Sequence, residues 1–107
     1  MAAELNTGFS KDLNKLINFP PEGIFSTVLT KTEGSSCTLM CLSKESSIDT
    51  HTSTKAGVIY VIKGKGKFKL FDEEIFMQNG TFIFMPKNSP HSLNAIEDLA
   101  IILLLTN

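Results

Sequence analysis

Short apolar stretches recur along most of the chain, and each contains several β-branched or aromatic residues. Glycine, asparagine, aspartate, serine and proline separate these stretches, and no long helical pattern lies between them. β-Branched and aromatic residues favour strands, and strands without intervening helices are typical of an antiparallel sandwich or barrel. The seven strands that the pattern predicts cover residues 24–31, 35–43, 57–63, 67–71, 73–78, 81–86 and 99–105.

A short amphipathic helix is predicted before the first strand. Apolar residues recur at helical spacing from Phe9 to Ile17, and Ser10 is the expected N-cap. Pro20 and Pro21 stop the helix, because proline lacks the amide hydrogen that a helix interior needs. We expect this helix to pack across a sheet or across the open end of a barrel.

The chain has room for one domain. Its 107 residues fall within the usual size of a single domain, and 42% of them are hydrophobic, which suffices for a small core. We assign residues 1–23 to the helix and its lead-in, and residues 24–107 to an all-β barrel.

Charge and hydropathy argue against several classes of partner. The formal net charge is −1, so no broad positive field attracts nucleic acid or anionic lipid. The N-terminus lacks the basic and apolar regions of a signal peptide. The longest apolar run, residues 99–105, is far shorter than the roughly 20 residues of a membrane helix. We therefore expect a cytoplasmic protein without a nucleic-acid or membrane partner.

The two cysteines, Cys37 and Cys41, are expected to be free thiols. They lie four residues apart on a predicted strand. A strand rises about 3.3 Å per residue, which separates their Cα atoms by about 13 Å. A disulfide needs a Cα separation below about 7 Å.

The chain has only two histidines, and both stand outside the apolar runs. His51 ends a polar stretch before a predicted strand, and His91 lies at a turn that Pro86 and Pro90 hold. Neutral imidazole binds transition metals and, with an unperturbed pKa of about 6.5, also serves in acid–base chemistry. On spacing alone, a shared site and two unrelated surface histidines both stay open.

The segment 80–91, GTFIFMPKNSPH, resembles the second sequence motif of the cupin superfamily. Gly80, Pro86 and His91 match that motif position by position. The motif's glycine two residues after the proline is Asn88 here, and asparagine also tolerates left-handed backbone. The resemblance implies a small antiparallel β-barrel, the double-stranded jelly roll.

The segment 51–64 resembles the first cupin motif, although two of its ligand positions are changed. His51 takes the place of the motif's first histidine, and Gly64 that of its closing glycine. Ser53 stands where the motif has its second histidine, and Gly57 where it has a glutamate.

The resemblance implies a metal site at His51 and His91, and the ion would be Zn, Fe, Ni or Mn. Two protein ligands are fewer than the three or four that metal sites usually provide. Two alternatives therefore stay open. Either Cys41 or Met40 from the neighbouring strand completes the ligand shell, or the pocket holds no metal.

Alternation along the strands predicts further pocket residues, since side chains two residues apart share a face of a strand. The predicted pocket around the histidines consists of Ser53, Gly57, Ile59, Val61 and Cys41. Its interior would be mixed polar and aliphatic. Because the second histidine and the glutamate are missing, we expect a neutral or weakly polar ligand.

Three functions fit these observations. The first is a small-molecule-binding cupin whose histidines hold the ligand directly or through one metal ion. The second is an enzyme of the dioxygenase, isomerase or lyase type found among cupins, with metal or free imidazole as its acid–base group. The third is a structural barrel that dimerises and binds no ligand.

A homodimer is also expected. Residues 82–85 and 99–105 are nearly continuous apolar runs, whereas a strand with one solvated face alternates apolar with polar residues. The barrel interior covers one face of these strands, and the short helix covers only part of the other. A second copy of the chain would cover the rest, and two-fold dimers are the commonest homo-oligomers.

Overall fold

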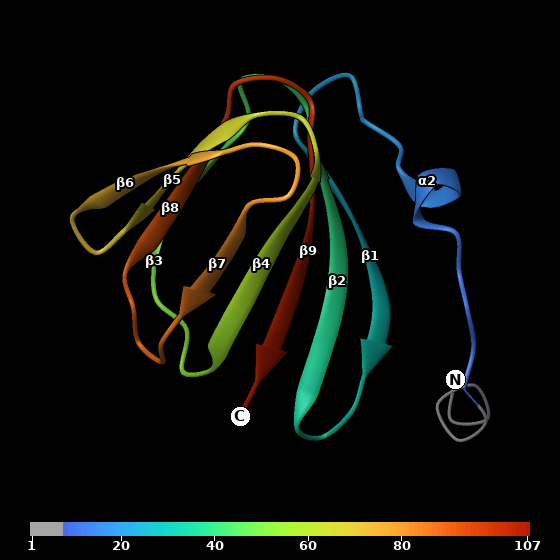
Figure 1. The fold of residues 1–107 in the computed structure, drawn as a ribbon, viewed down its shortest axis with the longest axis horizontal. Helices are drawn as coiled ribbons and strands as arrows, with labels where there is room; N and C mark the ends of the chain where they lie inside the picture. The colour runs from blue at the N-terminus through green and yellow to red at the C-terminus, as the bar shows by residue number, and fades with distance from the viewer. Residues whose placement is uncertain (1–7) are drawn as a thin grey trace.

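The structure, a computed structural model, describes residues 8–107 of the chain. Within them, nine strands form two antiparallel sheets that face each other (Figure 1). Sheet A has the strand order β1-β2-β9-β4-β7, and sheet B has the order β3-β8-β5-β6. The strands are β1 (Ile24–Lys31), β2 (Ser35–Leu42), β3 (Ser47–His51), β4 (Ala56–Lys63), β5 (Gly66–Leu70), β6 (Glu73–Met77), β7 (Phe82–Met85), β8 (His91–Ala95) and β9 (Leu99–Thr106).

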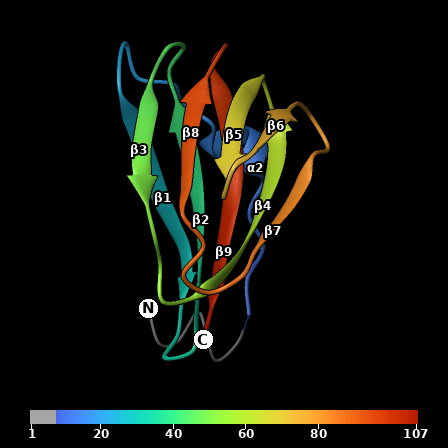
Figure 2. The same ribbon diagram turned by 90° about the vertical axis from the view of Figure 1, so that its left-hand side faces the viewer.

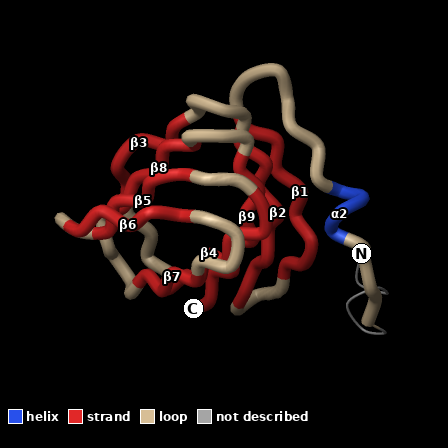
Figure 3. The backbone as a smooth tube through the Cα atoms, turned by 45° about the horizontal axis from the view of Figure 1, so that its top comes forward, coloured by secondary structure: helices blue, strands red, loops and turns tan. Residues whose placement is uncertain are grey.

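This double sheet confirms the predicted all-β barrel. Figure 3 shows the strands surrounding the interior, with the short helix α2 (Leu13–Leu16) outside. Successive side chains of a strand point to opposite faces of its sheet. In β4, Ile59 and Val61 are therefore buried in the core, whereas Tyr60 is exposed. β1 begins at Ile24, where the barrel was expected to start.

The helix α2 is shorter than predicted and begins later. Its N-cap is Asp12 rather than Ser10, because the Asp12 carboxylate accepts a hydrogen bond from the amide of Asn14 (3.0 Å). At the other end, Ile17 already has extended backbone (φ −65°, ψ 121°). Among residues 8–107, no helix is long and apolar enough to cross a membrane.

The segment around α2 covers part of the outer face of sheet A. Figure 2 shows α2 behind this sheet, on the side away from sheet B. Leu16, Ile17 and Phe19 pack against a buried cluster that includes Leu39 and Ala100. The predicted packing of the helix across a sheet is thereby confirmed, although most of the covering residues follow the helix.

Sheet B contains two strands that the apolar pattern does not predict, β3 and β8. Both are mostly polar, and their core residues are Ile48 in β3 and Leu93 and Ala95 in β8. The two strands pair antiparallel, with Ile48 opposite Leu93 and His51 opposite His91. The apolar pattern misses β3 and β8 because each has few apolar residues, and a histidine stands at the end of β3 and at the start of β8.

Two backbone positions explain features of the motifs. Gly64 has a φ of 93°, and a Cβ there would lie only 1.9 Å from the carbonyl oxygen of Asp98. Any other residue at this position would therefore strain the chain where it passes from β4 to β5. Asn88 has a φ of 63°, so asparagine adopts the left-handed conformation expected of it.

The cysteines agree with their prediction. Cys37 and Cys41 both lie on β2, and both are free thiols. Burial raises the pKa of the Cys37 thiol above its ordinary value. The Cys37 thiol is therefore protonated at neutral pH.

The interior changes character along the barrel. At one end, the side chains of Leu42, Val61, Met77 and Leu99 are completely buried in one apolar cluster. At the other end, the inward positions of β3 and β8 are histidines, and the interior is hollow. We call these regions the packed end and the open end.

Candidate functional site

The two histidines meet at the open end of the barrel. His51 is the last residue of β3 and His91 the first residue of β8, and the two residues face each other in the pairing of these strands. Their ring centroids lie 4.2 Å apart, with an angle of 61° between the ring planes. The structure therefore brings together two residues that are 40 positions apart in the sequence.

Each imidazole is anchored to the backbone through its Nδ1 atom. The Nδ1 of His51 lies 2.9 Å from the carbonyl oxygen of Asp49, and the Nδ1 of His91 lies 2.8 Å from that of Ser89. A carbonyl oxygen can only accept, so each Nδ1 carries a hydrogen and donates it. In the neutral ring, the Nε2 atom then has a free lone pair. The site thus contains two imidazole acceptors.

A cavity of about 250 Å³ adjoins the two rings, and we call it the main chamber. Its walls are mostly aliphatic, thioether or aromatic, and its polar lining residues are the histidines and Ser92. A mostly apolar pocket with a few convergent polar groups is the usual form of a small-molecule site. The lining residues are Met40, Ile48, His51, Ile59, Phe68, Met85, His91, Ser92, Leu93, Ile101 and Leu103.

A second hollow of about 70 Å³, the small chamber, also borders the histidine pair. It shares His51, His91, Met85 and Leu103 with the main chamber, so the rings stand where the two hollows meet. Its wall is more polar, and it contains a lysine. The residues found only in the small chamber are Ser53, Lys55, Pro86, Ser89 and Leu105.

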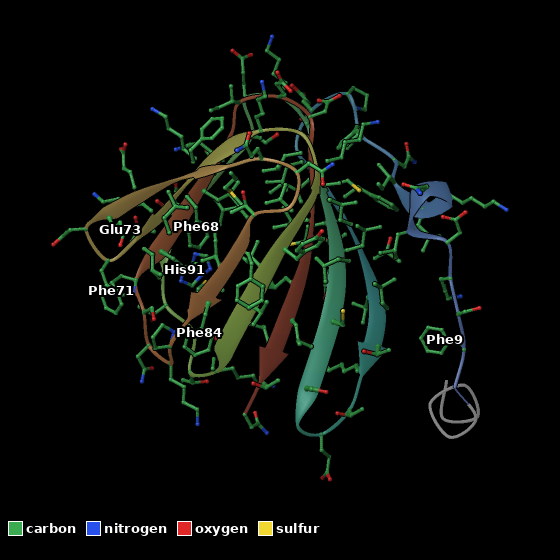
Figure 4. The ribbon with its side chains drawn as sticks, viewed as in Figure 1. Phe9, Phe68, Phe71, Glu73, Phe84 and His91 are labelled. Atoms are coloured by element: carbon green, nitrogen blue, oxygen red, sulfur yellow. The ribbon has the colours of Figure 1, made fainter. Side chains whose placement is uncertain are left out.

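The His91 ring is held on its apolar side by Phe68. Figure 4 shows Phe68 and His91 close together. Their ring centroids are 5.8 Å apart and the ring planes are nearly parallel, at 21°. Burial lowers the pKa of His91 below its ordinary value, and the nearby His51 lowers it further. The hydrogen bond to the Ser89 carbonyl opposes these effects. At neutral pH, His91 is therefore a neutral imidazole with an available Nε2.

Two of the predicted pocket residues lie in the hollows. Ser53 lines the small chamber, and its hydroxyl accepts a hydrogen bond from the amide of Lys55 (3.1 Å). Ile59 lines the main chamber. Val61 lies on the same face of β4, but it is completely buried in the apolar cluster toward the packed end.

Gly57 and Cys41 do not line either chamber. A Cβ at Gly57 would lie 2.8 Å from the Met85 Cε atom, so the methionine occupies the space beside this glycine. Cys41 packs with Leu39 on the outer face of sheet A, since strand alternation turns it away from the interior. This corrects the prediction of Cys41 as a pocket residue, whereas its neighbour Met40 does line the main chamber.

The donor set does not fit a tightly held metal ion. Among residues 8–107, no three histidine, cysteine, aspartate or glutamate side chains gather at one point. Of the two changed motif positions, Ser53 offers only a hydroxyl, and at Gly57 the methyl group of Met85 fills the space. Two neutral nitrogens without a carboxylate or thiolate are fewer ligands than metal sites provide.

Sequence reasoning missed several lining residues, above all Lys55 and Met85. Met85 belongs to an apolar run that the pattern predicts as a strand, but only the three-dimensional packing shows that it lines both chambers. Lys55 lies in the loop between β3 and β4. The sequence did offer a signal for Lys55. It follows Ser53 by two residues, in the same polar stretch as His51.

The comparisons with known proteins agree with this architecture. A model of the family described as Cupin domain matches residues 38–106, so the chain belongs to the cupin domain family. No curated protein matches the chain in sequence.

Solved structures with the same fold include proteins of very different size. A conserved protein of unknown function from Streptococcus pyogenes is 22% identical with a TM-score of 0.85, over 92% of this chain and 87% of that one. A cupin superfamily protein from Desulfitobacterium hafniense is 13% identical with a TM-score of 0.83, over 88% and 86% of the two chains. Salicylate 1,2-dioxygenase from Pseudoaminobacter salicylatoxidans, in an adduct with gentisate, is 16% identical with a TM-score of 0.74, over 84% of this chain and 26% of that one. At these identities, the likenesses show the fold alone.

Proposed function

We propose that the protein is a small-molecule-binding cupin whose ligand occupies the main chamber and is held directly by the two histidines. The observation that carries the proposal is the geometry of the pair: both Nδ1 atoms donate to backbone carbonyls, which leaves both Nε2 atoms as acceptors, and both histidines line one hollow. The ligand then has an apolar body and a hydrogen-bond donor. The apolar body packs against residues such as Ile59 and Phe68.

A tightly bound metal is not part of this proposal. The Nε2 pair can still hold a divalent ion weakly, because neutral imidazole is a good ligand for Zn, Fe, Ni and related ions. Such an ion would compete with the ligand for the same lone pairs. The shortage of protein ligands and the filled space at Gly57 support direct binding instead.

Catalysis is the second candidate function. A neutral imidazole whose pKa lies below its ordinary value stays available as a base at neutral pH, and His91 is in this state. The substrate would be a molecule with an acidic proton that reaches Nε2 from the main chamber. The dioxygenase with the same fold supports this candidate only in showing that enzymes can be built on this fold.

We also propose that two copies of the chain pair through the uncovered part of the outer face of sheet A. Tyr60, Phe82, Phe84 and Leu104 are exposed there, and strand pairing places them side by side. The segment around α2 covers a neighbouring part of this face. These four side chains are uncharged and mostly apolar, so the same surface of a second copy can pack against them.

The test of direct binding uses phenol and anisole, which share a ring but differ in the hydroxyl donor. We expect phenol to bind wild-type protein in the main chamber more tightly than anisole. His51→Phe and His91→Phe each remove an Nε2 acceptor. Because phenol has a single hydroxyl hydrogen to donate, at least one of the two variants should lower phenol affinity by fivefold or more, at about 1 kcal/mol per net hydrogen bond. Thr54→Ala, an exposed position of the same loop, serves as the control.

The binding measurement is followed by NMR, and elemental analysis of untagged protein accompanies it. A stoichiometric transition metal retained through purification would overturn direct binding. Equal affinities of phenol and anisole, unaffected by either histidine variant, would show that the Nε2 pair does not hold the ligand.

A further inference from the structure

Lys55 differs from every other lysine of the chain. The chain has ten positive residues, all of them lysine and all within the described residues. Nine are exposed, and Lys55 alone is partly buried. Burying part of a charged side chain costs free energy unless a partner compensates it. The partial burial of Lys55 therefore needs an explanation, whereas the exposed lysines need none.

The loop that carries Lys55 is fixed against the second motif. The amide of Lys55 donates to the Ser53 hydroxyl (3.1 Å), and the Ser53 carbonyl accepts a hydrogen bond from the amide of Asn88 (2.7 Å). These bonds join the loop after β3 to the loop before β8. The lysine thereby lines the small chamber in a loop that is tied on both sides.

Lys55 has no acidic partner within the described residues. No aspartate or glutamate lines the small chamber, and no ion pair involves this lysine there. The hydrogen-bonding groups that do line it, besides the histidines, are the hydroxyls of Ser53 and Ser89. Ser89 already donates to the Pro86 carbonyl. Lys55 is thus a lining residue of the small chamber whose positive charge has no acidic partner among the residues around that chamber.

We infer that the small chamber binds a carboxylate, so that the ligand of the proposed function is a small hydroxy-monocarboxylic acid with an apolar body. The inference rests on that function, because it places the ligand's body in the main chamber. The hydroxyl donates to an Nε2 of the histidine pair, and the carboxylate extends past the rings toward Lys55. This orientation keeps the negative charge away from the Nε2 lone pairs and brings it to an ammonium group.

The size of the small chamber sets the class of anion. Its volume of about 70 Å³ admits one small polar group beside the lysine, and the wall supplies a single positive charge. A monocarboxylate meets both conditions, whereas a phosphate or a dicarboxylate would bring a second charge without a partner. This inference replaces the expectation from the sequence. There, the absence of the motif's second histidine and glutamate favoured a neutral ligand, whereas Lys55 favours an anionic one.

The experiment compares acids with their neutral amides. The probes are mandelate and mandelamide, lactate and lactamide, and benzoate and benzamide, each titrated by NMR at low and high salt. We expect at least one acid to bind about tenfold more tightly than its amide, as a charge-assisted hydrogen bond predicts. Lys55→Gln should abolish this preference and leave the affinity for the amide unchanged, whereas Lys87→Gln, on an exposed lysine of the neighbouring loop, should change neither.

The outcomes separate this inference from the proposed function. Amides that bind in the main chamber as tightly as the acids, in wild type and Lys55→Gln alike, would overturn the carboxylate site and leave the small-molecule site standing. Acids that bind to wild type without shifting any signal from the main chamber would overturn the proposed function as well. Absence of binding by all six probes would overturn both. As a control for folding, Lys55→Gln should unfold thermally at the same temperature as the wild-type protein.

Discussion

The packed end and the open end of the barrel are built by the same strands, yet only one of them is filled. On β9, Leu99 is completely buried, whereas Leu103, on the same face and four residues later, borders both chambers. On β8, Leu93 and Ala95 are buried in the core, whereas His91 opens onto both hollows. One pair of sheets therefore has a filled apolar core at one end and two hollows at the other.

The largest expected effect is the loss of a leucine at the packed end. Leu99→Ala should lower the free energy of unfolding by about 2–5 kcal/mol, because it removes a completely buried side chain and leaves a cavity. Leu103→Ala is the matched control on the same strand. Its cost should be smaller by about 1 kcal/mol or more, since part of the leucine already faces a hollow. Chemical denaturation measures both, and equal losses would contradict the division between the ends.

A charge on the outer face of sheet A should separate the proposed dimer without unfolding the barrel. Phe84 is 55% exposed on this face, so Phe84→Lys adds a charge to the pairing surface but leaves the interior intact. We expect wild-type protein to have about twice the 11.7 kDa mass of one chain in light scattering, and the variant to have the mass of one chain. Phe76→Lys, on a 51% exposed residue of sheet B, should remain a dimer. A monomeric wild type would refute the pairing.

The smallest expected effect is a pH dependence that originates at the open end. The pKa of His91 is lower in the folded chain than its ordinary value of about 6.5, so the unfolded chain binds more protons in this range. Stability should therefore fall as the pH drops below about 6.5 and continue to fall until it passes the folded pKa. The charged or titratable residues that share a hollow with His91 are His51, Lys55, Lys69 and Asp72.

His91→Gln isolates this contribution. Urea unfolding of the ligand-free variant should give a shallower loss of stability between pH 7 and pH 5 than wild type, because the variant has no imidazole to protonate at this position. The remaining groups titrate in both proteins, so the difference between the two curves belongs to His91 and its neighbours. Parallel curves would contradict the lowered pKa.

Much of the fold was predictable because its apolar strands are short runs of β-branched, aromatic and other apolar residues between turn-forming residues. β1, β2 and β9 agree with the predicted strands to within one residue. β3 and β8 could not be predicted in the same way, since tertiary pairing rather than their own composition makes them strands. The helix was predicted too long. Apolar residues at helical spacing begin at Phe9, but the helix itself begins only after its N-cap, Asp12.

The candidate site was predictable only in part. His51 and His91 could be found because the motifs and the scarcity of histidine single them out. Cys41 was placed in the pocket from its type, although its strand turns it outward. The role of Met85 beside Gly57 depends on packing between β4 and β7, and that of Lys55 depends on the bond between Ser53 and Asn88. No local pattern contains such contacts.

The central claim is that the imidazoles of His51 and His91 offer their Nε2 atoms as acceptors to one ligand. Long-range ¹H–¹⁵N NMR of the imidazoles, recorded above pH 7 with and without phenol, tests it most directly. We predict protonated Nδ1 and unprotonated Nε2 in both His51 and His91, with at least one Nε2 signal moving as phenol is added. Protonated Nε2 atoms, or Nε2 signals that stay fixed while phenol binds, would contradict the account.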